Sequence, residues 1–157
     1  MTTEQRSGRK PFEPTRDFTI VPNAIFRLYT RLPDFKAEHA LLYAYLCSQY
    51  NVDYGYAFPS SEDISATLNC SERTVTKVKV VLVERELVEI ARHPTHGNDV
   101  YIVKPAITDE DAFFERFPEA REHVETRQKA SSQRRQASAL RKRMFEERVR
   151  NGKSCGS

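Results

Sequence analysis

The fold is decided by the stretch Asp63-Ile64-Ser65-Ala66-Thr67-Leu68-Asn69-Cys70-Ser71-Glu72-Arg73-Thr74-Val75. Ile64 and Leu68 lie four residues apart, which places both side chains on one face of a helix. Asn69 tolerates the left-handed backbone conformation in which helices commonly end. Ser71 is a good N-terminal cap for a further helix. The stretch therefore predicts two helices joined by a tight turn.

The second of these helices is expected to run from Ser71 to about Arg85. Seven of the ten residues from 74 to 83 are β-branched, a composition that favours a strand. A helix is still predicted, because the run lacks Gly and Pro and because residues 80–83 are all apolar, which breaks the alternation of a half-exposed strand. The inward-facing side chains are expected to be Val75, Val78 and Leu82.

Upstream of this pair, Ser60 is expected to cap the first helix, with Asp63 completing a capping box. The β-branched and aromatic residues of 18–21 predict a short strand that stops at Pro22. Further elements are predicted as a short helix over 24–30, a buried central helix from about 36 to 50 and a loop over 51–58.

Downstream, two short runs of alternating polarity, 87–92 and 99–103, predict a β-hairpin with its turn at Gly97 and Asn98. Thr108 is expected to cap one more helix, for which the apolar face consists of Phe113, Phe114 and Phe117. Pro118 is expected to interrupt that helix.

Charge is distributed unevenly along the 157 residues, a length that suits one compact domain with extensions. Residues 1–120 carry 14 basic and 18 acidic side chains, a net charge of −4, whereas residues 121–157 carry 11 and 4, a net charge of +7. Such a basic end suggests an anionic partner, most commonly nucleic acid. Residues 1–16 are predicted to be a flexible basic arm. Residues 120–157 are predicted to be a basic tail, either helical from about Ser132 to Val149 or disordered.

The three cysteines, Cys47, Cys70 and Cys155, are odd in number and widely spaced, which suits neither a disulfide framework nor a zinc site. We therefore expect a reducing, cytoplasmic location and no bound cofactor. No apolar run is long enough to cross a membrane, and residues 1–10 lack the apolar core of a signal peptide.

Two helices joined by a tight turn and followed by a hairpin form a winged helix-turn-helix, an α+β fold that is here mainly helical. We assign residues 17–104 to this domain and residues 105–119 to a short helical extension. In such domains the second helix of the pair enters the DNA major groove, and the hairpin, or wing, lies along the backbone or minor groove. Double-stranded DNA is accordingly the expected partner.

The ordered motifs resemble the winged helix-turn-helix domain of replication initiators and DNA-binding regulators of bacterial plasmids and phages. The matching pieces are Phe18-Thr19-Ile20-Val21-Pro22-Asn23, Leu41-Leu42-Tyr43-Ala44-Tyr45-Leu46, Tyr56-Ala57-Phe58-Pro59-Ser60, the stretch 63–75 and Leu87-Val88-Glu89-Ile90. The resemblance implies DNA replication or transcription regulation, by a homodimer on a two-fold site. The chain departs from the pattern at Ser65, Asn69 and Cys70, where the family prefers Ala, Gly and Val.

The candidate DNA-binding residues on the second helix are Ser71, Glu72, Arg73, Thr74, Thr76, Lys77 and Lys79, and those on the wing are Arg92, His93 and His96. Arg73 is the best candidate, since a guanidinium can bind guanine with two hydrogen bonds. Thr76 can reach a base edge and Lys77 a phosphate. The alternative is an ordinary solvated helix face. Ser71 is expected to act mainly as a cap, and the two histidines lack the further ligands of a metal site.

The sequence thus predicts a sequence-specific double-stranded DNA-binding protein and not an enzyme. Two other classes stay open, a nicking enzyme of a mobile element and a protein-interaction adaptor built on a winged helix. Nicking would require a catalytic tyrosine, whereas Tyr43, Tyr45 and Tyr50 fall on the buried helix and are expected to serve the core. For the basic tail the alternatives are nonspecific DNA affinity and a helix that binds a protein partner.

Overall fold

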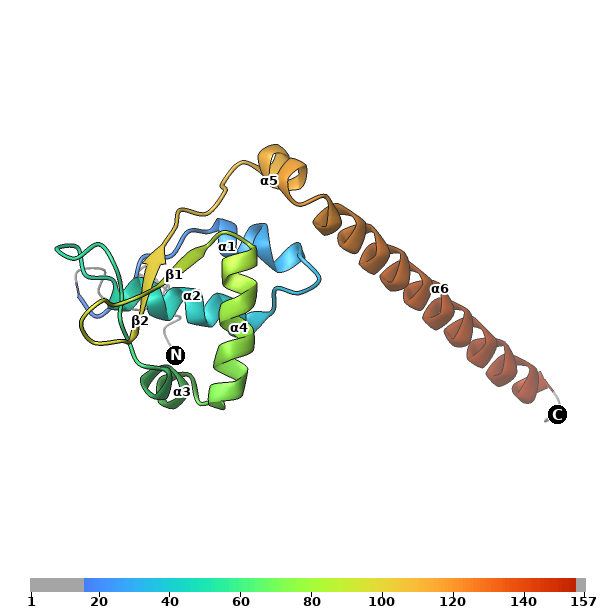
Figure 1. Ribbon diagram of the computed structural model, residues 1–157. Coiled ribbons are helices and arrows are strands. Elements are labelled where there is room, and N and C mark those ends of the chain that lie inside the picture. Colours follow the sequence, from blue (N-terminus) through green and yellow to red (C-terminus); the bar gives the residue numbers. More distant parts are fainter. Residues whose placement is uncertain (1–15, 155–157) are drawn as a thin grey trace, which may run out of the picture.

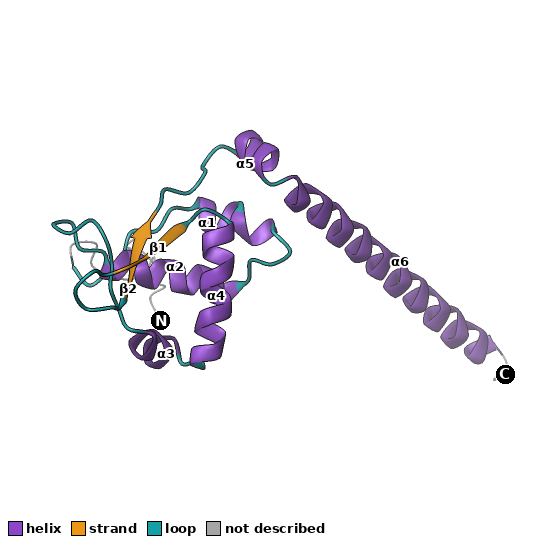
Figure 2. Cartoon of the chain, viewed as in Figure 1, coloured by secondary structure: helices purple, strands orange, loops and turns teal. Residues whose placement is uncertain are grey.

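The computed structural model describes residues 16–154, so all but the last residue of the predicted arm 1–16 lies outside the described residues. The elements are α1 (Ala24–Arg27), a 3₁₀ turn η1 (Tyr29–Arg31), α2 (Ala37–Gln49), α3 (Ser61–Leu68), α4 (Glu72–Glu84), β1 (Val88–Arg92), β2 (Asp99–Val103), α5 (Glu110–Arg116) and α6 (Pro118–Ser154). Figure 1 shows α1 to α5 gathered into one body from which α6 projects. Figure 2 shows that helices dominate and that the sheet is a single hairpin, which confirms the mainly helical α+β class.

Helix α2 is the central element of the body and contacts α3, α4 and β2. Leu42, Tyr43 and Leu46 are fully or almost fully buried, but Leu41 is 53% exposed, so α2 is central without being buried all round. Its first turn is closed by His39, where Nδ1 accepts a hydrogen bond of 2.9 Å from the backbone N–H of Lys36. Burial lowers the pKa of His39, which favours the neutral imidazole that this acceptor role requires.

The helix-turn-helix pair has the caps that its sequence predicts. The Ser60 hydroxyl accepts a hydrogen bond of 3.0 Å from the Asp63 N–H, and the Asp63 carboxylate accepts one of 3.2 Å from the Ser60 N–H. Asn69 ends α3 in the left-handed conformation, with φ +52°. The Ser65 hydroxyl donates to the Cys70 carbonyl across the turn, so this departure from the family's Ala finds a backbone partner.

The hairpin pairs β1 and β2 in antiparallel register, with Val88 opposite Val103 and Arg92 opposite Asp99. Its turn runs over residues 94–96, earlier than predicted, and Gly97 follows it with φ +65°. The His93 N–H closes the loop with a hydrogen bond of 2.8 Å to the Asn98 carbonyl. A single bridge from Ala57 to Tyr101 extends the sheet by one residue, so the predicted loop 51–58 is attached to the wing.

Three sequence-based expectations are corrected. Residues 18–21 form no strand, and the sheet in the described residues consists of β1 and β2 with the single bridge from Ala57. The predicted helix 24–30 divides into α1 and η1. The N-terminal cap of α5 is Asp109 and not Thr108. The Asp109 carboxylate accepts a hydrogen bond of 2.9 Å from the Ala112 N–H. The break expected at Pro118 is present: α5 ends at Arg116, Phe117 is not helical, and Pro118 begins α6, since proline suits the first helical position, where the missing N–H costs nothing.

Helix α6 joins the body through its first turns only. Ala120 is fully buried, together with Phe113 and Phe117 of the preceding segment, and Tyr29 packs its ring against Phe113 at 5.0 Å between centroids. From residue 132 onward every described side chain of α6 is exposed. The described part of the basic tail, up to Ser154, is therefore a continuous helix that starts well before the predicted Ser132. No helix in residues 16–154 combines the length and the apolar character needed to cross a membrane.

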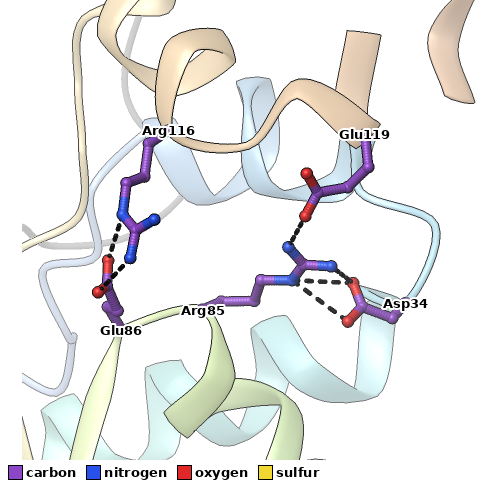
Figure 3. A network of polar contacts seen from close by, with 5 residues as sticks. All are labelled: Asp34, Arg85, Glu86, Arg116 and Glu119. Carbon is purple, nitrogen blue, oxygen red and sulfur yellow. Dashed lines mark hydrogen bonds and ion pairs between the residues drawn. The ribbon is translucent and has the colours of Figure 1, made fainter. Parts of the chain in front are cut away.

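A network of charged side chains joins the end of α4 to the start of α6 (Figure 3). Arg85 donates to both carboxylate oxygens of Asp34 at 2.9–3.2 Å and to the carboxylate of Glu119, while its guanidinium lies 5.2 Å from the ring centroid of Phe117. Glu86, which has φ +59°, accepts two hydrogen bonds from Arg116 at 2.6 and 3.0 Å. The hydrogen bond from Arg85 lowers the pKa of Glu119, which keeps this carboxylate charged at neutral pH.

Replacement of Arg85 by Ala should cost about 1–3 kcal/mol of unfolding free energy, measured by urea denaturation, because it leaves two carboxylates without their partner. Arg116→Ala is the matched control. The Arg85 side chain is 12% exposed and the Arg116 side chain 55% exposed, so the control should destabilise the protein much less than Arg85→Ala does. Equal losses for the two variants would show that burial does not set the strength of this network.

Candidate nucleic-acid interface

The exposed face of α4 presents a row of four side chains, Arg73, Thr76, Lys77 and Val80, spaced three or four residues apart. The opposite face buries Val75, Val78 and Leu82 in the core, as predicted. Nothing in residues 16–154 pairs with Arg73 or Lys77, so both cations face solvent. We call these four residues the α4 row.

The polar residues at the start of α4 serve the helix itself. The Ser71 hydroxyl accepts a hydrogen bond of 3.1 Å from the Thr74 N–H and lies 3.0 Å from the Thr74 hydroxyl. The Thr76 hydroxyl donates to the Glu72 carbonyl at 3.0 Å, which leaves its oxygen lone pairs free to accept. Ser71 is thus a cap, as expected, and half-buried Thr74 is less accessible than the α4 row.

Lys79 is not available for DNA contact, and its assignment to the candidate set is corrected. Its side chain is only 10% exposed, and Nζ donates to the Ser61 hydroxyl at 3.0 Å and lies 3.7 Å from the Asp99 carboxylate and 5.1 Å from the ring centroid of Tyr101. Burial lowers the pKa of Lys79, against the opposing effect of Asp99. Position 79 faces the hairpin, so this lysine joins α3, α4 and β2.

On the wing, Arg92 is exposed at the end of β1, and the two histidines shape the turn. The Nδ1 atom of His93 accepts hydrogen bonds from the N–H groups of Thr95 and His96 at 3.1 and 3.2 Å. The His93 and His96 rings stack with centroids 4.8 Å apart. In residues 16–154 no group of three or more His, Cys, Asp or Glu side chains is placed to hold a metal ion.

Two features of this surface were not predicted from the sequence. Val80 belongs to the α4 row and is 51% exposed, but the candidate set included only polar residues. Its spacing of seven residues from Arg73 was the available signal. The aromatic residues Tyr54, Tyr56 and Phe58 were treated as an ordinary loop, although aromatic side chains at three alternate positions are unusual there.

The basic residues of α6 surround the helix instead of lining one face. They are Arg134, Arg135, Arg141, Lys142, Arg143, Arg148 and Arg150, all exposed. The predicted apolar stripe of Leu140, Met144 and Phe145 is not continuous. Leu140 and Met144 share a face of the helix. Phe145 lies about 100° around the helix from Met144, since each residue of an α-helix is rotated by that angle from the one before it. This part of α6 therefore lacks the apolar seam of a coiled coil.

Replacement of Lys79 by Met should cost about 1 kcal/mol of unfolding free energy, because the Ser61 hydroxyl and the 44% exposed Asp99 carboxylate lose their contacts with Nζ. Lys77→Met is the matched control, since Lys77 is exposed and unpaired in the described part of the chain, and should change stability by less than about 0.5 kcal/mol. Thermal and urea unfolding of both variants measure this difference. A stable Lys79→Met protein would mean that the junction does not hold the wing.

Among known protein families, the model of a helix-turn-helix domain matches residues 36–88 of this chain. No curated protein matches the chain. Similar solved structures include an MDR initiator, 23% identical with a TM-score of 0.45 over 62% of this chain and 84% of that one. A Rep–DNA complex is 21% identical with a TM-score of 0.48 over 66% and 87% of the two chains. The N-terminal domain of a DNA-binding protein is 24% identical with a TM-score of 0.43 over 71% and 95%. Residues 36–88 are thus a helix-turn-helix domain, which the hairpin of β1 and β2 completes as a winged helix.

Proposed function

We propose that the chain binds double-stranded DNA in a sequence-specific manner, with α4 in the major groove and the wing on the adjacent backbone or minor groove. The observation that carries this proposal is the α4 row, an exposed set of side chains on the second helix of a helix-turn-helix. Its two cations, Arg73 and Lys77, have no partner within residues 16–154 and are available to an anionic ligand.

Each member of the α4 row suits a different part of a DNA site. Arg73 lies in the first turn of α4, where its guanidinium can bind the O6 and N7 atoms of a guanine. Thr76 can accept from a base amino group, and Val80 can contact a thymine methyl group. Lys77 provides a phosphate contact, which positions the helix without reading sequence. Arg92 and His96 are suited to the backbone beside the wing.

The charge distribution supports a division of labour between the body and α6. Residues 1–120 carry a net charge of −4, so the local cations of the α4 row act against a weakly repulsive background. Residues 121–157 carry +7, and the arginines that surround α6 suit a polyanion more than an apolar partner. We assign to α6 a sequence-independent attraction to DNA phosphates.

We further propose that the protein acts in the cytoplasm, in a plasmid or phage system, as a replication initiator or a transcription regulator. The ordered motifs from residue 18 to residue 90 support this context. A homodimer on a two-fold site is the expected arrangement, because paired half-sites match a two-fold protein. We propose that the chain acts by binding and catalyses no DNA cleavage.

Replacement of Arg73 by Ala should weaken binding to the preferred site by about 1–3 kcal/mol and relax the base preference at one position. The site is first selected from a random DNA pool, and both proteins are then titrated on it and on its single-base variants. Lys77→Ala is the comparison, and it should weaken all sequences alike because its contact is to phosphate. If Arg73→Ala also weakened all sequences equally, its role in base readout would be wrong.

Replacement of Arg134, Arg135, Arg141, Lys142 and Arg143 by Gln should make the salt dependence of DNA binding shallower. Each phosphate contact that is lost lowers the slope of log K against log salt by about 0.9. In the control variant, Lys replaces the four arginines. It keeps the positive charge, so the slope of log K against log salt should stay the same. An unchanged slope in the Gln variant would remove α6 from the DNA interface.

A further inference from the structure

The loop between α2 and α3 carries an exposed group of aromatic side chains, Tyr54, Tyr56 and Phe58, which we call the aromatic cluster. The three rings contact one another, with centroids 5.8, 6.1 and 6.4 Å apart. Tyr54 is 62% exposed and Phe58 52% exposed. Aromatic side chains bury large areas when they enter a core, so three that meet at the surface indicate an interaction site.

Backbone hydrogen bonds fix the shape of this loop. The Asn51 side-chain oxygen accepts from the N–H groups of Asp53 and Tyr54 at 2.9 and 3.1 Å. Gly55 turns the chain with φ +77°, a conformation that favours glycine, and its N–H donates to the Asn51 carbonyl at 2.8 Å. Ala57 then exchanges two hydrogen bonds with Tyr101, at 2.7 and 2.9 Å. The cluster is therefore preorganised, which lowers the entropic cost of binding.

The aromatic cluster continues onto the wing. Tyr56 contacts the His93 ring at 6.3 Å, and His93 stacks on His96. Five rings thus form one series from the loop to the tip of the hairpin, and exposed Arg92 precedes His93 at the end of β1. Figure 1 shows the loop before α3 and the turn between β1 and β2 at the same end of the body.

We propose that the aromatic cluster is a binding site for unpaired nucleobases of single-stranded DNA. Such sites combine ring faces, on which bases stack regardless of sequence, with a nearby cation for the backbone. The cluster offers the rings, and the wing that it contacts through His93 carries a cation, Arg92, at the end of β1. Bases in an intact duplex already stack on one another, so the cluster distinguishes single strands from the duplex that α4 binds.

This inference rests on the proposed function only in its choice of nucleic acid as the occupant. The cluster adjoins the wing, which we place along DNA, and the chain runs from Phe58 directly to Ser60, the cap of α3. The alternative occupant of the aromatic cluster is a second copy of the chain, packed against the three rings. The experiment below has a separate outcome for each.

The chain contains no Trp, so Tyr54→Trp creates a sole indole reporter within the cluster. Phe26→Trp is the matched control, since Phe26 is 63% exposed on α1 and takes no part in the cluster. Full-length proteins are titrated with a 15-nucleotide oligo(dT) under excitation selective for Trp. We expect saturable quenching of the Trp at position 54 and none at position 26. Absence of quenching at 54, or equal quenching at both positions, would overturn the proposal.

Ring deletion tests the same site without a reporter. Tyr54→Ala and Phe58→Ala should each weaken oligo(dT) binding about fivefold or more, whereas Tyr54→Phe keeps the stacking face and should bind as the wild type does. If Tyr54→Ala and Phe58→Ala bound oligo(dT) as tightly as the wild type does, the proposal would be contradicted. So would an emission change of the Trp at position 54 that follows protein concentration in the absence of DNA, since that would place a second copy on the rings.

Failure of this inference and failure of the proposed function give different results. Arg73→Ala should lose duplex preference and keep oligo(dT) binding, because its side chain lies outside the cluster. If the wild type bound no duplex selectively but the Trp at position 54 were quenched by oligo(dT), duplex recognition would be wrong and the single-strand site would stand. Selective duplex binding without that quenching would reject the single-strand site alone.

Discussion

The arrangement of the whole binding surface depends on one buried ammonium group, that of Lys79. It joins the first turn of α3 through Ser61 to the first residue of β2 through Asp99, and it covers the ring of Tyr101. Tyr101 in turn pairs with Ala57, which holds the aromatic loop. Helix pair, wing and loop therefore share one junction. Moving a lysine out of water costs free energy, and this cost is offset only when all its partners are in place, so the junction favours a single arrangement.

A second junction fixes α6 relative to the same helix. Arg85 ends α4, and its partners Asp34 and Glu119 come from the segment before α2 and from the first turn of α6. The Phe113, Phe117 and Ala120 side chains add an apolar contact at the same place. The two ends of α4 thus have separate tasks. The N-terminal half displays the exposed row, and the C-terminal end holds the long helix to the body.

Local chemistry made the helix-turn-helix predictable from sequence. Ser60, Asp63, Asn69 and Ser71 act on their own neighbours within a few residues, so their roles follow from spacing. The role of Lys79 depends on which surface packs against α4, which no local pattern encodes. The strand expected at residues 18–21 depends in the same way on a pairing partner, which local composition does not encode. The break at Pro118 was predictable because proline is disfavoured in a helix interior, whereas the helix that Pro118 begins was not predicted at that position.

The long helix also affects how the molecule moves through solution. At 1.5 Å per residue, the 37 residues of α6 extend about 55 Å, and most of that length stands clear of the body. A particle of this shape experiences more friction than a sphere of equal mass. On a sizing column a single chain will therefore elute ahead of compact proteins of the same mass. Early elution alone is not a sign of a dimer, and the stoichiometry has to come from light scattering or sedimentation equilibrium, which do not depend on shape.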